Sequence, residues 1–232
     1  MANSPSERAK ISREVYATLS KDPLSVQFLW PWFWSMLPGH SPVTDSLPWM
    51  TFRAIRWLKS YLSPEMTVFE YGAGGSTLFL AKRVRVLTSI ENDARWHAAI
   101  SHALQAAGIS NCDLRLIPAQ RRVSMERVRY GPRSYTSTDP ELAGLSLEGY
   151  VRSIDEFPDR TFDLVSVDGH ARFSCVTHAV PKLREGGYLL FDNSDWQIYG
   201  EIVRSLDNYS RTDFPGPGPF QPTGWRTSIW RM

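Results

Sequence analysis

The sequence has few of the features that mark metal-binding, secreted or membrane-spanning chains. Its only two cysteines, Cys112 and Cys175, lie far apart and form no metal-binding or redox motif, so we expect two reduced thiols. No apolar run reaches the roughly 20 residues that a membrane span requires, and the polar N-terminus is unlike a signal peptide. The net charge is only +2, which does not call for a nucleic-acid partner. We therefore expect a cytoplasmic protein with no transmembrane span and no nucleic-acid partner, and homo-oligomerisation stays open.

The composition is that of one soluble domain. The chain has 232 residues, of which 42% are hydrophobic and 22% are charged, and this is enough to bury a full core. Short β-rich runs alternate with longer segments of helical spacing, as an α/β protein requires. We expect strands over 67–71, 86–90, 113–117, 162–168, 188–191 and 225–231, and helices over 8–20, 48–63, 76–83, 93–107, 148–155, 172–184 and 195–206.

A glycine-rich turn after the first strand carries the strongest signal. The stretch Thr67–Thr77 is an apolar strand that ends in Glu70, followed by a turn with three glycines and then by Ser76, which can cap the next helix. The second strand ends in another acid, Glu91, 21 residues after Glu70. A strand, a glycine turn, a helix and an acid about 20 residues later are typical of a nucleoside-binding site.

The turn departs from the pattern of a dinucleotide site. The pattern Gly-x-Gly-x-x-Gly requires a glycine where this chain has Thr77. Glu70 lies two residues before the first glycine and would repel a pyrophosphate. S-adenosylmethionine (SAM) instead carries an ammonium and a sulfonium, and a carboxylate near the turn suits such a cationic ligand. The residues therefore favour SAM over a nicotinamide dinucleotide.

This region resembles the first motif of the class I SAM-dependent methyltransferases, apolar-apolar-acid-x-Gly-x-Gly, with Ser76 where many members have a further glycine. The resemblance implies an α/β fold that is Rossmann-like and doubly wound, with a mostly parallel seven-stranded sheet and an antiparallel C-terminal strand. It implies SAM as the cofactor, with Glu91 at the ribose and Asn92 beside the adenine. The expected cofactor-binding residues are Glu70, Tyr71, Gly72, Gly74, Gly75, Ser76, Thr77, Glu91, Asn92 and Asp168.

Acids also follow two later strands, at the edge of an open parallel sheet where ligands bind. Asp168 follows one strand, and the pair Asp192 and Asn193 follows the next. These residues resemble the later motifs of small-molecule O-methyltransferases of the catechol and caffeoyl-CoA types, in which such groups hold a divalent metal. The resemblance implies a Mg²⁺ site at Asp168, Asp192 and Asn193, because oxygen ligands with open positions suit this ion.

The chain departs from those families after Asp168, where it has His170 and Arg172 instead of a lysine. His170 is the best candidate for a base that removes a hydroxyl proton, because its unperturbed pKa lies near neutrality. The alternative is that His170 only hydrogen-bonds the turn. We expect Asp168 and His170 to be catalytic. Structural or surface roles are expected for His40, His97, His102 and His178.

A longer part of the chain resembles a less characterised group of bacterial methyltransferases, often linked to polysaccharide or secondary-metabolite pathways. The shared outline comprises Leu47–Trp49, Phe69–Thr77, Asp168–Arg172 and Asp192–Ser194, so the resemblance covers about residues 47–195. It implies methyl transfer to a hydroxyl of a small molecule or glycan.

Two segments have no role in the core of the predicted methyltransferase domain, which spans 47–232. Residues 1–46 are expected to form a helical and aromatic cover. Its run Phe28–Leu37 suits packing under the domain, a lid over the substrate, or a membrane interface. Residues 119–158 form an insertion that suits an anionic or sugar-like acceptor or else is a solvated helix and loop. We predict that 22–46 and 119–158 shape the acceptor pocket rather than the SAM pocket. The arginines and tyrosines interleaved at 121–135 of the insertion are Arg121, Arg122, Arg127, Arg129, Tyr130, Arg133 and Tyr135.

Two functions of other classes remain as alternatives. An NAD(P)-dependent oxidoreductase is disfavoured by Thr77 and by the lack of a second catalytic domain. A non-catalytic SAM-binding or interaction module would use the aromatic N-terminal segment as its partner surface. Neither the identity of the acceptor nor metal dependence follows from the sequence.

Overall fold

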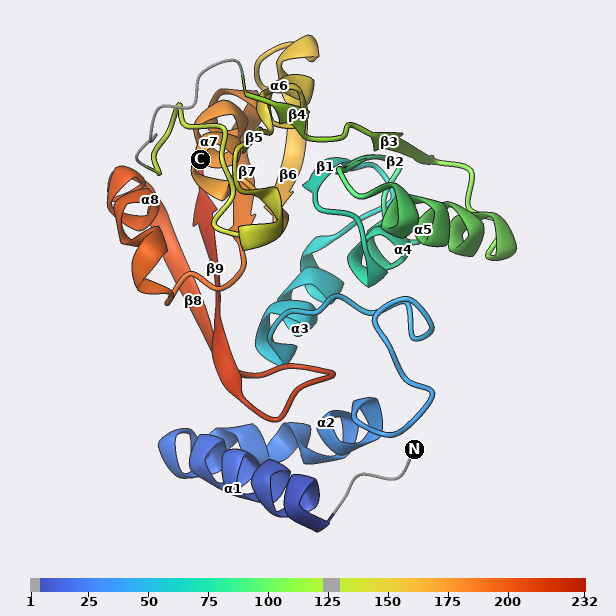
Figure 1. Cartoon of the computed structure of the whole chain (residues 1–232), viewed down its shortest axis with the longest axis vertical. Helices are drawn as coiled ribbons and strands as arrows, with labels where there is room; N and C mark the ends of the chain where they lie inside the picture. The colour runs from blue at the N-terminus through green and yellow to red at the C-terminus, as the bar shows by residue number, and fades with distance from the viewer. Residues whose placement is uncertain (1–4, 123–129) are drawn as a thin grey trace.

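The computed structural model describes residues 5–122 and 130–232. Its main sheet has seven strands in the order β3-β2-β1-β6-β7-β9-β8 (Figure 1). The first five of these are parallel, and β9 runs antiparallel between β7 and β8, so the predicted fold class is confirmed. The strands are β1 (Thr67–Tyr71), β2 (Val86–Glu91), β3 (Cys112–Leu116), β6 (Phe162–Val167), β7 (Leu183–Phe191), β8 (Ser210–Pro217) and β9 (Gly224–Arg231), with β4 (Gln120–Arg121) and β5 (Leu145–Ser146) in a separate small sheet.

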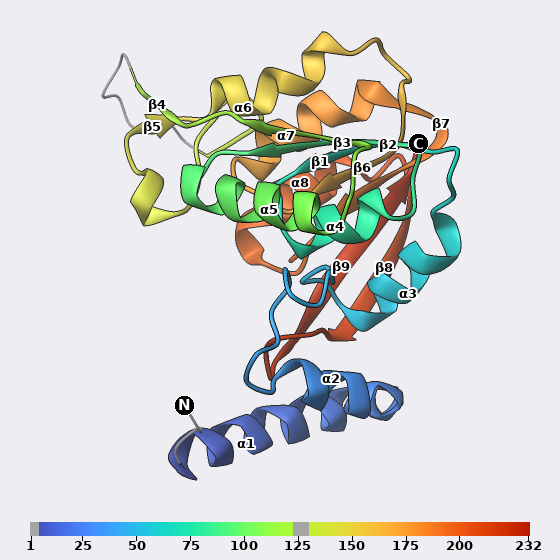
Figure 2. The ribbon, with the colours of Figure 1, turned by 90° about the vertical axis from the view of Figure 1, so that its right-hand side faces the viewer.

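Helices cover both faces of the main sheet. Figure 2 shows α6 and α7 on one side of it and α4 and α5 on the other. The α-helices are α1 (Pro5–Lys21), α2 (Leu29–Ser35), α3 (Phe52–Tyr61), α4 (Gly75–Ala81), α5 (Ala94–Ala106), α6 (Glu148–Arg152), α7 (Arg172–Ala179) and α8 (Gly200–Ser205). Short 3₁₀ helices are η1 (Pro23–Phe28), η2 (Pro140–Leu142), η3 (Ser153–Glu156), η4 (Val180–Lys182) and η5 (Gln197–Tyr199).

The central strands are apolar on both faces because each face packs on helices. In β1, Phe69 and Tyr71 belong to the core shared with α6, α7 and α8, while Val68 belongs to the core shared with α3 and α4. Leu189 and Leu190 of β7 divide between the two cores in the same way. This alternation follows from the two-residue period of a strand.

Proline accounts for the main differences from the predicted elements. The helix before β1 begins at Phe52 rather than Pro48, and Thr51 caps it by accepting a hydrogen bond from the N–H of Ala54. The helix after β6 ends at Ala179, five residues earlier than predicted, and Pro181 lies in the 3₁₀ turn that follows. Strand β8, which the sequence did not predict, contains two prolines and lies at the sheet edge, where a missing N–H is tolerated.

The N-terminal segment packs across the tip of the β8–β9 hairpin (Figures 1 and 2). Trp32 is fully buried, and its Nε1 donates to the carbonyl oxygen of Gln221 at 2.7 Å. Ser35 Oγ accepts the N–H of Phe220 at 3.1 Å. Helix α2 therefore holds the loop between β8 and β9, and the role of residues 1–46 as a cover stays a prediction. Trp30, by contrast, is 77% exposed.

Within the described ranges, no helix combines the length and the apolar character needed to cross a membrane. The expected cytoplasmic location stays a prediction.

Candidate functional site

The turn after β1 and the turn after β6 approach each other so closely that no side chain fits between them. Gly72 has a φ of +91°, in the left-handed region, and donates its N–H to the carbonyl oxygen of Ile90 at 2.9 Å. A Cβ on Gly72 would lie 2.6 Å from the Cα of Gly169. This contact brings the glycine turn and Asp168 to one cavity.

Glu70 supports the start of α4 from beneath this cavity. Its Oε2 accepts hydrogen bonds from the hydroxyls of Thr77 and Ser89, both at 2.6 Å. Thr77 Oγ1 in turn accepts the N–H of Gly74 at 2.8 Å. The side-chain bond at the helix start therefore comes from Thr77 and not, as predicted, from Ser76. Burial raises the pKa of Glu70 to about 7.

Glu91 lines the same cavity and also fixes its backbone. One carboxylate oxygen accepts the N–H groups of Asn92 (2.7 Å) and Asp93 (2.8 Å), and the other accepts the N–H of Ala73 (3.2 Å). Burial raises the pKa of Glu91, while these backbone N–H groups act in the opposite direction. Because a carboxylate offers about four lone-pair sites, the oxygen bonded to Ala73 can still accept from a ligand hydroxyl.

The first cavity has a volume of about 370 Å³ and brings together most of the predicted cofactor-binding residues. Glu70, Tyr71 and Thr77 are not among the described residues that line it. The Tyr71 side chain lies in the core and donates its hydroxyl to the carbonyl oxygen of Val151 at 2.6 Å. The lining residues are Pro42, Trp49, Gly72, Ala73, Gly74, Gly75, Ser76, Glu91, Asn92, Asp93, Trp96, Asp168, Gly169 and His170.

Six of these residues were not among the predicted site residues: Pro42, Trp49, Ala73, Asp93, Trp96 and Gly169. Trp96 donates its Nε1 to the carbonyl oxygen of Ala73 at 2.5 Å, which places an aromatic ring beside the turn. Trp49 lies in the Leu-Pro-Trp stretch, which was a usable signal. Pro42 lies in the segment predicted to serve only the acceptor, and its carbonyl oxygen sits where a Cβ on Gly75 would lie. By contrast, none of the aromatic side chains of Phe28–Leu37 lines this cavity in the described chain.

His170 belongs to a second cavity of about 380 Å³, which shares Asp168, Gly169 and His170 with the first. His170 Nδ1 lies 3.0 Å from Ser137 Oγ, which also accepts the N–H of Asp139 at 3.0 Å. Burial lowers the pKa of His170, although the Asp139 carboxylate acts to raise it. The cavity is lined by Tyr130, Ser137, Thr138, Asp139, Asp168, Gly169, His170, Ala171, Arg172, Trp196 and Tyr199.

Among the described residues, the insertion contributes Tyr130, Ser137, Thr138 and Asp139 to this second cavity and none of its arginines. Tyr130 lines the cavity, and its hydroxyl accepts the N–H of Phe173 at 3.3 Å. Of the predicted arginines, Arg121 and Arg133 are exposed and line neither cavity in the described ranges. Arg127 and Arg129 lie outside the described residues.

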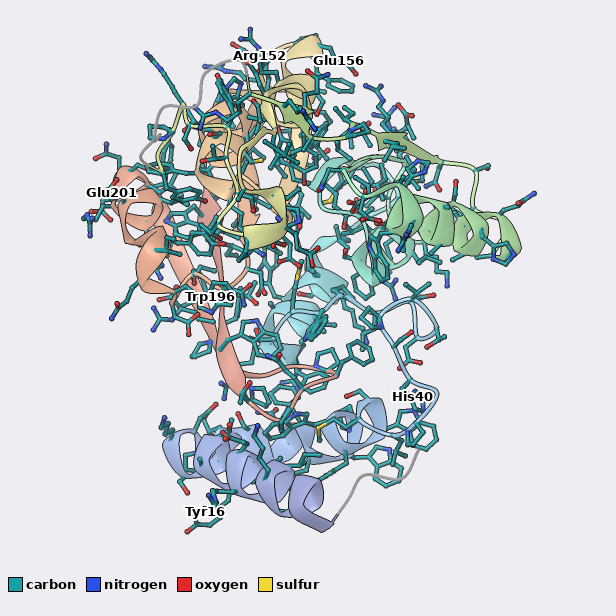
Figure 3. The ribbon with its side chains drawn as sticks, in the orientation of Figure 1. Tyr16, His40, Arg152, Glu156, Trp196 and Glu201 are labelled. Atoms are coloured by element: carbon teal, nitrogen blue, oxygen red, sulfur yellow. The ribbon has the colours of Figure 1, made fainter. Side chains whose placement is uncertain are left out.

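A third cavity of about 320 Å³ also contains Asp168 and has tryptophan walls. Trp196, which is labelled in Figure 3, precedes η5. Trp196 is 51% exposed, whereas Trp225 is 7% exposed. The cavity is lined by Trp49, Asp168, Arg172, Asp192, Asn193, Trp196, Gln221 and Trp225.

The three predicted metal ligands lie together, but every side-chain oxygen among them except Asp168 Oδ2 has another partner in the described residues. Asp168 Oδ1 and Asn193 Oδ1 accept hydrogen bonds from Arg172, at 3.0 and 3.2 Å. Asp192 is buried and accepts Trp225 Nε1 at 3.0 Å on both carboxylate oxygens. Burial, followed by the nearby Asp168 charge, raises the pKa of Asp192 well above its usual range. This arrangement does not fit Mg²⁺, because the Arg172 guanidinium lies between Asp168 and Asn193 and the Asp192 carboxylate faces Trp225 and Thr227.

Three of the four other histidines contact structural partners. His40 and His178 pair through Nδ1 with Asp45 (2.9 Å) and Asp155 (2.8 Å). His97 Nε2 lies 3.5 Å from the carbonyl oxygen of Leu114. In the described part of the chain, none of them lines the three cavities.

No family model and no curated protein matches the sequence. Solved structures do share the fold. A proposed O-methyltransferase from Klebsiella pneumoniae is 16% identical, with 97% of this chain and 96% of that one covered and a TM-score of 0.51. A tRNA (m1A58) methyltransferase from Aquifex aeolicus is 13% identical, with 83% and 76% covered and a TM-score of 0.52. A proposed methyltransferase from Streptococcus mutans, in complex with S-adenosylhomocysteine, is 11% identical, with 76% and 94% covered and a TM-score of 0.50. At these identities the comparisons show a shared Rossmann-like methyltransferase fold.

Proposed function

We propose that this chain is a SAM-dependent methyltransferase that transfers a methyl group to a hydroxyl of a small molecule or glycan. The observation that carries the proposal is the meeting of the first and second cavities at Asp168, Gly169 and His170. Methyl transfer requires the acceptor oxygen to approach the methyl group in line with its bond to sulfur. Two cavities that share one wall allow this approach.

In this proposal the first cavity binds SAM. The glycine turn and Ser76 contact the methionine end, and Glu91 accepts hydrogen bonds from the ribose hydroxyls. Asn92 and Trp96 flank the adenine, for which the indole ring offers a flat apolar surface. The complex of the Streptococcus mutans protein with S-adenosylhomocysteine supports the choice of cofactor.

The second cavity binds the acceptor, and His170 takes its proton. The acceptor oxygen forms a bond to the methyl carbon as the carbon–sulfur bond breaks, which leaves S-adenosylhomocysteine as the product. The hydroxyl proton passes to Nε2 of His170, which has no hydrogen-bond partner among the described residues. This role requires Nδ1–H to donate to Ser137 Oγ, because only that tautomer leaves Nε2 free to accept a proton. Burial lowers the pKa of His170, so the base is neutral at pH 7.

The acceptor is proposed to be small because the second and third cavities, of about 380 and 320 Å³, match a small ligand or one or two sugar units. The Aquifex aeolicus protein acts on tRNA, so RNA belongs in any acceptor panel. Transfer to RNA but to no small hydroxyl compound would overturn this part of the proposal.

Calorimetry with SAM, S-adenosylhomocysteine and NAD tests the cofactor. We expect micromolar binding of the first two and none of NAD. Transfer of a labelled methyl group to a panel of sugars, phenols and RNA then tests turnover, with His170→Gln as the variant and His178→Gln as its control away from the cavities. Binding of NAD in place of SAM would point to an oxidoreductase. SAM binding with no turnover on any acceptor would favour a non-catalytic module.

A further inference from the structure

The guanidinium of Arg172 joins the two strand ends that border the acceptor cavities. Its Nε donates to the carbonyl oxygen of Gly169 at 2.8 Å. One terminal nitrogen donates to the carbonyl oxygen of Asp192 (2.7 Å) and to Asn193 Oδ1 (3.2 Å). The other donates to the carbonyl oxygen (2.9 Å) and Oδ1 (3.0 Å) of Asp168. A guanidinium has five N–H donors, and each of them has an oxygen partner here.

The site is built to keep this cation buried. Arg172 is only 9% exposed, and its guanidinium carbon lies 5.8 and 5.4 Å from the ring centroids of Phe191 and Tyr199. Guanidinium is weakly hydrated and stacks on aromatic faces, so it tolerates such a position better than an ammonium does. The Asp168 carboxylate supplies the opposite charge at 3.0 Å.

The sequence resemblance assigns three side chains to a divalent metal, and Arg172 binds oxygen atoms of two of them, Asp168 and Asn193. The third, Asp192, presents its carboxylate to Trp225 and Thr227 instead, and it offers Arg172 only its main-chain carbonyl oxygen. A metal ion bound to Asp168 and Asn193 would have to displace the guanidinium, whose positive charge already occupies the position between them.

We propose that Arg172 replaces the divalent metal of this site as a fixed positive charge that positions Asp168. One oxygen of Asp168 is held by Arg172. The other, Oδ2, has no partner in the described residues, and Asp168 lines all three cavities. Oδ2 is therefore left to accept a hydrogen bond from the acceptor hydroxyl. This role in turnover rests on the proposed methyltransferase function, and it makes turnover independent of divalent metal.

The first test measures metal binding and needs no acceptor. Wild-type protein should not bind Mn²⁺ in calorimetry or electron paramagnetic resonance. Arg172→Ala frees the oxygens of Asp168 and Asn193 and should gain Mn²⁺ binding, whereas the exposed variant Arg152→Ala should not. Wild-type protein that binds Mn²⁺ through Asp168, so that Asp168→Asn abolishes the binding, would overturn the proposal.

The second test measures turnover. Wild-type turnover should be unchanged by excess chelator. Arg172→Ala should lower kcat about 10–100-fold, the usual effect of removing a group that orients an active-site ligand, and millimolar guanidinium should restore part of it. Wild-type turnover that is lost with chelator and restored by Mg²⁺, or a folded Arg172→Ala protein with unchanged kcat, would refute the proposal.

If Arg172→Ala does not fold, Arg172→Lys replaces it in the turnover test, with folding checked by thermal melting, and the metal test then rests on the wild-type protein and Asp168→Asn. Lysine keeps the charge but cannot supply five N–H donors, so kcat should fall while the affinity for S-adenosylhomocysteine stays the same. Equal losses of kcat and of that affinity would instead indicate a general structural role. If the wild-type protein binds no SAM, the proposed function fails, while the Mn²⁺ measurement still decides whether Arg172 occupies the metal position.

Discussion

Replacing Glu70 by glutamine should change how the stability of the protein depends on pH. Glu70 is 1% exposed, and burial raises its pKa to about 7 from the ordinary value of 4.5. Between about pH 4.5 and pH 7, Glu70 has lost its proton in the unfolded chain but keeps it in the folded protein. The folded protein therefore loses stability as the pH rises from about 4.5 to about 7.

The size of this loss follows from the difference between the two pKa values. Each unit is worth about 1.4 kcal/mol, so Glu70 should cost the wild-type protein about 3 kcal/mol above pH 7 relative to pH 4. Glutamine cannot ionise, and its carbonyl oxygen can still accept from the hydroxyls of Thr77 and Ser89. The stability of Glu70→Gln should thus lack this component of the pH dependence.

Urea denaturation at five pH values between 4 and 8 measures the effect. The free energy of unfolding of Glu70→Gln minus that of the wild type should rise by about 3 kcal/mol over this range. If the new amide group itself alters the free energy of unfolding, it does so equally at every pH and therefore does not contribute to this rise. Glu141→Gln, at an exposed position, controls for the loss of one carboxylate. A difference that stays flat from pH 4 to 8, or that falls, would refute the argument that Glu70 is buried with a raised pKa.

Three further variants test the proposed site. Wild-type kcat/KM should increase with pH as His170 loses its proton, with a midpoint below the ordinary 6.5 because burial lowers its pKa; His170→Gln should lack this limb of the profile. Glu91→Ala should weaken SAM binding by about 1–3 kcal/mol in calorimetry, because it removes a charged hydrogen-bond acceptor; unchanged affinity would contradict the role at the ribose. Gly169→Ala should lower the melting temperature and SAM affinity together, because its Cβ would overlap the buried Tyr150 hydroxyl. Adding Tyr150→Phe should restore part of both, and a double variant no better than the single one would contradict this explanation.

The elements around the first cavity were predictable because local signals determine them. The apolar run before Glu70, the glycine turn and the acid at Glu91 all lie within 25 consecutive residues. Each has a backbone reason that acts at short range, such as the left-handed φ of Gly72. Strand β8 was missed for the opposite reason: Pro215 and Pro217 argue against a strand, and only pairing with β9 stabilises it.

The chemistry at the second group of acids was harder to predict because it depends on contacts distant in sequence. Asp168, Asp192 and Asn193 at successive strand ends predict a metal site only if their carboxylates have no other hydrogen-bond partners. Whether they are free depends on Trp225 and Thr227, more than 30 residues after Asp192. No local pattern contains this information.

The contact between Trp32 and the loop of the β8–β9 hairpin bears on how this protein can be divided. A cut before residue 47 would look harmless, because the sheet and every described lining residue of the first cavity except Pro42 lie in the remaining chain. Yet the removed part carries the indole that binds the carbonyl oxygen of Gln221, and Gln221 lines the third cavity. A truncated protein would lose Pro42 from the wall of the first cavity and the Trp32 contact to a residue of the third cavity. Any expression boundary should therefore retain the first 46 residues, and under the proposed function substitutions among them offer a way to change acceptor preference.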